Sequence, residues 1–148
     1  MKKIGLVVNP VAGMGGSVGL KGTDGGMHRK AIEMGAKPVT PRQTIALLQA
    51  IQKKDQVSFL CAPGKMGADY FKSFSYPYRV VGEINLDTSA EDTIRIANQI
   101  AEEGAELLVF VGGDGTARDI HDAVGTRVPV VAVPSGVKVF SAVFAVSA

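Results

Sequence analysis

Five consecutive apolar residues at 107–111, Leu-Leu-Val-Phe-Val, constrain the fold of this chain more than any other feature. A strand that is apolar at every position has both faces covered, which is typical of the interior of a parallel sheet. Further mainly apolar runs at 4–8, 57–61 and 130–133 alternate with helical patterns, as in βαβ units. We therefore expect an α/β fold, with an open, mostly parallel, doubly wound sheet of about five strands and helices on both faces.

The pattern also predicts a strand at 79–82 and helices at 27–34, 42–54, 66–74, 89–103, 116–124 and 138–146. In the helix over 42–54, Ile45, Leu48 and Ile51 have the spacing of one buried face. The helix that ends at Gly104 begins with a capping box, in which we expect Thr88 to cap and Glu91 to reach back. Its predicted buried face carries three residues, Ile94, Ala97 and Ala101.

Length and charge narrow the class of protein. The 148 residues suit a single domain, so we expect one α/β domain over residues 1–148. Because 16 Lys and Arg are offset by 14 Asp and Glu, a nucleic-acid partner is disfavoured. One cysteine excludes an internal disulfide and favours the cytoplasm. No apolar stretch is long enough for a membrane span, and the N-terminus does not have the pattern of a signal peptide.

The last predicted helix, residues 138–146, is apolar almost all round. Such a helix is normally buried on every side. We therefore expect either a partner subunit in a homo-oligomer or a further C-terminal domain to cover it.

Three strand ends carry small or turn-forming residues, and ligands of open parallel sheets bind at such ends. They are the segments at 9–13, with Asn9 first, at 112–116, and at 134–138. In the second segment, glycines connect a buried strand directly to the helix that follows it. Backbone amides at the start of that helix, together with the helix dipole, favour a phosphate there. The sequence therefore predicts an anion site beside the run Gly-Gly-Asp-Gly-Thr.

Asp114 lies within this run, and two interpretations of it are open. A carboxylate repels phosphate, so Asp114 suits a role as acceptor of a hydroxyl proton or as a holder of Mg²⁺ beside phosphates. Alternatively, Asp114 is only the cap of the helix that begins near Thr116.

The common nucleotide-binding motifs are absent from the sequence. The glycine-rich stretch at 13–18 has Val18 where a dinucleotide fingerprint has its third glycine, and no Gly-Lys-Ser/Thr run forms a P-loop. A plain Rossmann dehydrogenase and a P-loop enzyme are therefore excluded.

The three loops together resemble those of the superfamily that contains NAD kinases and diacylglycerol or sphingosine kinases. The segments that carry the resemblance are 9–13, 112–116 and 134–136. The stretches 19–25, 62–64 with Asp69, 88–93 and 135–145 look like the ATP- or polyphosphate-dependent NAD kinase family of prokaryotes, so that the resemblance covers essentially the whole chain. Members of that family carry a further, β-rich C-terminal domain.

This resemblance implies phosphoryl transfer from ATP or polyphosphate to the 2′-hydroxyl of NAD, with Mg²⁺ or another divalent cation whose protein ligands it leaves open. Asp114 would orient or deprotonate the accepting hydroxyl. The implied phosphate and nucleotide contacts are Asn9, Gly112, Gly113, Gly115, Thr116, Ser135 and Gly136.

Two alternatives stay open. The turn Pro134-Ser135-Gly136 is closer to the lipid-kinase form than to the Asn-containing turn of standard NAD kinases, which favours a diacylglycerol-type kinase. The Asn-Glu pair with which NAD kinases hold the nicotinamide nucleotide would lie beyond Ala148, so a non-catalytic nucleotide-binding module is the other alternative.

Other reactive side chains have ordinary explanations. We expect Cys61 to be a packed thiol and His121 to lie on a solvated helix face. Lys21 and Lys65 are either surface lysines or partners of phosphate. The loop at 10–26 has the length of a lid over a ligand.

Overall fold

The computed structural model describes residues 1–12 and 39–135. Its centre is a sheet of five parallel strands in the order β3-β2-β1-β4-β5. The strands are β1 (Lys2–Val8), β2 (Val57–Cys61), β3 (Tyr78–Val80), β4 (Leu107–Gly112) and β5 (Val130–Pro134). The predicted α/β sheet is therefore confirmed, and β4 lies between two neighbours, as its apolar sequence indicated.

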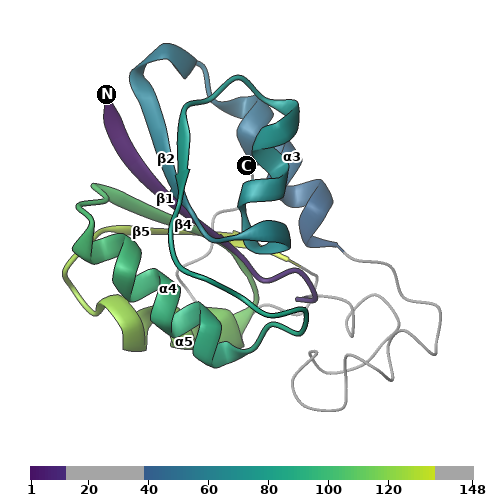
Figure 1. Cartoon of the computed structure of the whole chain (residues 1–148), viewed down its shortest axis with the longest axis vertical. Helices are drawn as coiled ribbons and strands as arrows, with labels where there is room; N and C mark the ends of the chain where they lie inside the picture. Colours follow the sequence, from purple (N-terminus) through teal and green to yellow (C-terminus); the bar gives the residue numbers. More distant parts are fainter. Residues whose placement is uncertain (13–38, 136–148) are drawn as a thin grey trace.

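Helices cover both faces of this sheet (Figure 1). The helices α4 (Ala90–Glu102) and α5 (Asp114–Val124) lie on one side, and α3 (Thr40–Ala50) lies on the other. Three short 3₁₀ helices complete the described part: η1 (Lys54–Gln56), η2 (Gly64–Met66) and η3 (Ala68–Ser73). In the described ranges, no helix combines the length and the apolar character that crossing a membrane requires.

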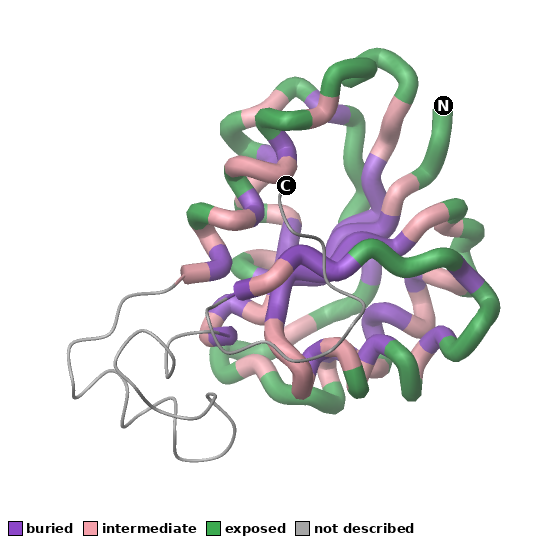
Figure 2. Tube along the Cα trace, turned by 180° about the vertical axis from the view of Figure 1, so that it is seen from behind, coloured by how far each residue is buried: buried purple, intermediate pink, exposed green. Residues whose placement is uncertain are grey.

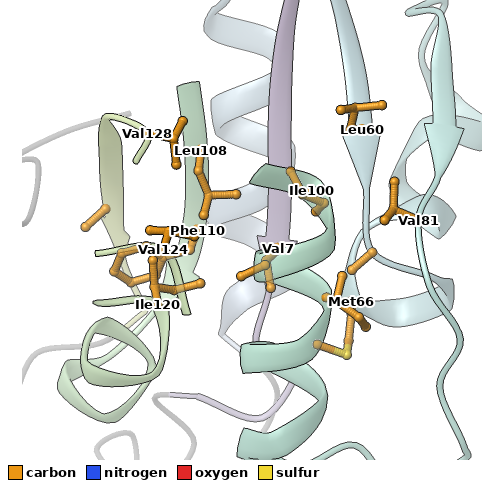
Figure 3. Packing of buried hydrophobic residues seen from close by; sticks show 14 residues of the cluster. Val7, Leu60, Met66, Val81, Ile100, Leu108, Phe110, Ile120, Val124 and Val128 are labelled. Atoms are coloured by element: carbon orange, nitrogen blue, oxygen red, sulfur yellow. The ribbon is translucent and has the colours of Figure 1, made fainter. Parts of the chain in front are cut away.

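Alternate residues of the strands supply two hydrophobic cores. From β1, Val7 packs on the side of α4 and α5, and Leu6 and Val8 pack on the side of α3. Figure 3 shows the first core, in which Phe110 of β4 meets Ile120 of α5. The buried residues follow the strands through the middle of the molecule, and the outer helix surfaces are exposed (Figure 2). This two-sided burial explains why 107–111 contains no polar residue.

Several predicted boundaries were wrong. The helix expected at 42–54 begins earlier, with Pro41 in its first turn, and ends at Ala50. It buries Thr40, Thr44 and Leu48, whereas Ile45 is 41% exposed. The strand expected at 79–82 is Tyr78–Val80, an edge strand with exposed residues.

The helix expected at 66–74 is instead the pair η2 and η3. The amide of Ala68 donates to the carbonyl of Ala62 over 2.8 Å, which ties the segment back to the end of β2. This bond spans six residues and does not have the four-residue spacing of α-helical hydrogen bonds. The predicted helices at 27–34 and 138–146 lie outside the described residues, as does most of the loop at 10–26.

The capping box was predicted one residue too early. Ser89, and not Thr88, is the N-cap: its hydroxyl accepts from the amide of Asp92 at 3.4 Å, and the Asp92 carboxylate accepts from the Ser89 amide at 2.9 Å. The buried face shifts with it, to Thr93, Ile96, Ala97 and Ile100, so that Ile94 and Ala101 are only partly buried.

This shifted cap is testable with two neighbouring substitutions. Ser89→Ala should lower the free energy of unfolding by about 1 kcal/mol, because it removes the acceptor of a helix N-terminal amide. Thr88→Ala, the matched control, should change it by less than about 0.5 kcal/mol. Urea denaturation of both variants measures the difference, and an equal loss in both would show that the cap assignment is wrong.

Candidate functional site

The candidate site lies at the carboxyl ends of β1 and β4, two neighbouring strands whose next described helices lie on opposite faces of the sheet. The next described element after β1 is α3, on one face of the sheet, whereas the element after β4 is α5, on the other face. The two strands are neighbours, and the amide of Asn9 donates to the carbonyl of Val111 over 2.9 Å. Ligands of doubly wound sheets bind outside the carboxyl ends of the strands at such a switch point.

The helix that begins at this point has no side-chain cap. The N-cap of α5 is Gly113, in an extended conformation with φ −111° and ψ −161°. The first helical hydrogen bond runs from the Ala117 amide to the Gly113 carbonyl at 3.0 Å. The amides of residues 114–116 therefore have no acceptor within the helix, and the helix dipole adds positive potential there. This arrangement favours an anion.

Asp114 is the first residue of α5 and is partly buried. Gly113, and not Asp114, occupies the N-cap position, so Asp114 is not the N-cap residue of this helix. The helix also begins two residues earlier than Thr116, where it was expected. A carboxylate is thus placed in the first turn, beside the amides that favour an anion.

Two adjacent glycines of this turn differ in their surroundings. A Cβ atom at Gly112 would lie 2.5 Å from Oγ1 and 2.6 Å from Cβ of Thr116, closer than real Cβ contacts. A Cβ atom at Gly113 would meet only Oγ of Ser135, at 3.7 Å, which is ordinary van der Waals contact. Gly112 is therefore required by packing within the protein, whereas the protein's own atoms leave room for a side chain at Gly113.

Asn9 and Thr116 also meet at this point. The side-chain amide of Asn9 donates from Nδ2 to Oγ1 of Thr116 over 3.1 Å, and its Oδ1 accepts from the amide of Val11 at 3.2 Å. Thr116 is 4% exposed. Both ends of the Asn9 amide are thus engaged within the protein.

Ser135 completes the described part of the site. It follows β5, is 1% exposed, and donates its amide to the carbonyl of Gly112 over 3.0 Å. The fold therefore brings together Asn9, Gly112, Gly113, Asp114, Thr116 and Ser135, with Gly115 in the same helical turn. Gly136 lies outside the described residues.

The other candidates lie elsewhere. Cys61 is fully buried at the end of β2, and burial raises the pKa of its thiol to about 12, so that the expected packed thiol is confirmed. His121 is exposed on α5, as expected. Within residues 1–12 and 39–135, no group of three or more His, Cys, Asp or Glu side chains could hold a metal ion.

One hollow was not found by sequence reasoning. A cavity of about 490 Å³ lies between α3 and η3, and Lys65 and Asp69 contribute to its lining. The other lining residues are Ile45, Gln49, Tyr70, Ser73 and Phe74. Its walls come from segments that no local pattern connects. Lys65 faces this cavity, and Lys21 lies outside the described residues.

The contrast between the two glycines leads to a prediction. Gly112→Ala should lower the free energy of unfolding by about 1–3 kcal/mol, because its Cβ overlaps Thr116. Gly113→Ala should change it by less than about 0.5 kcal/mol, since that position is open and its backbone is extended. Urea denaturation compares the two. Equal losses would contradict the packing role of Gly112.

The comparisons with known proteins agree with this geometry. The family model of the ATP-NAD kinase N-terminal domain matches residues 4–148, which include every strand of the sheet except the first residues of β1. A search of curated proteins found no significant match. NAD kinases are phosphotransferases that use ATP and NAD. Because the match spans nearly the whole sequence, the chain belongs to the ATP-NAD kinase family, as its N-terminal domain.

Proposed function

We propose that this chain forms the phosphate site of a kinase that transfers a phosphoryl group from ATP or polyphosphate to the 2′-hydroxyl of NAD, giving NADP. The observation that carries the proposal is the uncapped N-terminus of α5 at the switch point between β1 and β4, with Asp114 in its first turn. The family match supplies the reaction class. The buried single cysteine suits the reducing cytoplasm, where we place the reaction.

In this proposal the backbone of the turn binds the phosphates. The amides at the start of α5, with Gly113 and Gly115 leaving the approach open, bind phosphate oxygens. Ser135 and Gly136 line the same cleft from the end of β5. Negative charge on the phosphoryl oxygens spreads in the transition state, and fixed amide dipoles stabilise it without reorganisation.

Asp114 acts on the acceptor in this mechanism. Its carboxylate takes the proton of the 2′-hydroxyl while that oxygen forms the new bond to the terminal phosphorus. The bond from this phosphorus to its bridging oxygen breaks, and ADP or polyphosphate shortened by one phosphate leaves. A carboxylate suits this role and not phosphate binding, because two anions repel.

The donor set of the turn also fits a divalent cation. Mg²⁺ is usually held by one or two carboxylates together with substrate phosphates, and Asp114 is a carboxylate beside the phosphate-binding amides. As the alternative to its role as proton acceptor, Asp114 would hold the ion, which when bound neutralises phosphate charge.

A lipid kinase is the second candidate, since the turn at Pro134 and Ser135 resembles the lipid-kinase form. The two candidates differ in the acceptor, NAD or diacylglycerol, and share the phosphate site. A non-catalytic nucleotide-binding module is the third candidate, and it would bind nucleotide without turnover. A C-terminal domain or second copy that covers the apolar segment at 138–146 stays a prediction from the sequence.

The role of Asp114 is testable by Asp114→Asn in the full protein. We expect kcat for NAD phosphorylation to fall by about 100-fold or more, because the amide cannot accept the proton. Asp55→Asn is the matched control, since Asp55 is an exposed carboxylate in η1 before β2. Circular dichroism checks that both variants keep the fold.

Unchanged turnover in Asp114→Asn would overturn this role. The same assay offers NAD and diacylglycerol as acceptors, each with ATP and with polyphosphate. Phosphorylation of diacylglycerol alone would favour the lipid kinase. Nucleotide binding with no product from either acceptor would favour the non-catalytic module.

A further inference from the structure

Asn9 is held in place by hydrogen bonds of both its side chain and its backbone to other parts of the protein. Its Nδ2 donates to Oγ1 of Thr116 and its Oδ1 accepts from the Val11 amide, at 3.1 and 3.2 Å. The Asn9 backbone amide donates to the Val111 carbonyl at 2.9 Å. These bonds fix the orientation of the side chain, and a change that left either partner unpaired in this half-buried site would cost free energy.

Thr116 is equally constrained. It is 4% exposed, its Oγ1 accepts the hydrogen bond from Asn9, and its side chain fills the space over Gly112 where a Cβ would lie. Thr116 is also the third residue of α5, so its position determines the course of the first helical turn. The contact between Asn9 and Thr116 therefore connects the end of β1 to the turn whose amides favour an anion.

We propose that Asn9 and Thr116 are positioning residues: the hydrogen bond between their side chains holds the phosphate-binding turn at 113–116 in place, and neither side chain contacts the phosphates. This inference rests on the proposed function of that turn. Asn9 also fixes the amide of Val11, so the same side chain sets both the exit of β1 and the start of α5. The two side chains act by fixing the geometry of the backbone amides at the start of α5, and not through their own polar atoms.

Four variants test this role. Thr116→Val removes the acceptor at nearly constant shape, and Thr116→Ser keeps it. Asn9→Ala removes the donor and leaves the packing of Thr116 against Gly112 unchanged. It therefore tests the same hydrogen bond if Thr116→Val does not fold. The double variant Asn9→Ala with Thr116→Val measures the coupling between the residues. Thr44→Val is the matched control, because it removes a buried threonine hydroxyl that is hydrogen-bonded to the Thr40 carbonyl in α3.

The first measurement is amide hydrogen exchange by NMR, which does not depend on activity. Exchange at the Ala117 amide, which donates to the Gly113 carbonyl, should be about fivefold faster in Thr116→Val and in Asn9→Ala, because a hydrogen bond that restrains the turn is lost. The double variant should be no faster than the faster single variant. Thr116→Ser and Thr44→Val should keep the wild-type rates in this turn. Unchanged exchange in both single variants would overturn the proposal.

The second measurement is steady-state NAD phosphorylation in the full protein. We expect kcat to fall by about fivefold in Thr116→Val and to recover in Thr116→Ser. The losses of Asn9→Ala and Thr116→Val should not multiply in the double variant. Losses that multiply would show that Asn9 contacts the ligand directly, which contradicts the proposal. An inactive wild-type protein would overturn the proposed function, and hydrogen exchange would then still decide the positioning role.

Discussion

The pairing of β1 with β4 is the constraint on which the rest of this structure depends. It joins the two halves of the doubly wound sheet along five residue pairs, from Ile4 with Leu107 to Val8 with Val111. The hydrogen bond from Asn9 to Val111 extends the pairing past the end of β1. The next described helix after β1 is α3 and the next after β4 is α5, and these lie on opposite faces of the sheet, so the carboxyl ends of the two strands form a switch point of the kind at which ligands bind. The candidate site exists because this register places Asn9 beside the turn after β4.

Glycine has two different functions in that turn. Gly112 belongs to the interior, where the side chain of Thr116 occupies the space of a Cβ. Gly113 belongs to the surface of the site, where the nearest atom to such a Cβ is Oγ of Ser135, at ordinary contact distance. The two adjacent glycines, which look like one motif in the sequence, therefore have different roles: Gly112 is required by packing, and Gly113 is an open N-cap. The open N-cap is what leaves the α5 amides available to an anion.

Much of the fold follows from local patterns; the exact ends of the elements and the contacts between distant residues do not. The run at 107–111 predicted β4, because a strand that is buried on both faces is apolar at every position. The capping box shifted to Ser89 because two hydroxyls and two carboxylates stand next to each other, so that either register satisfies the pattern. The hydrogen bond between Asn9 and Thr116 joins residues that are 107 positions apart, and no local sequence pattern predicts it. The sequence could therefore place these residues at one site without separating positioning from binding.

The central claim is that the nucleotide phosphates bind at the N-terminus of α5. Amide NMR of the ¹⁵N-labelled protein during titration with ATP and Mg²⁺ tests this directly. The account predicts the largest chemical-shift changes at the amides of residues 113–117 and at Ser135, with little change in α4 or at the amino ends of the strands. Changes that are confined to the cavity between α3 and η3 would contradict the account.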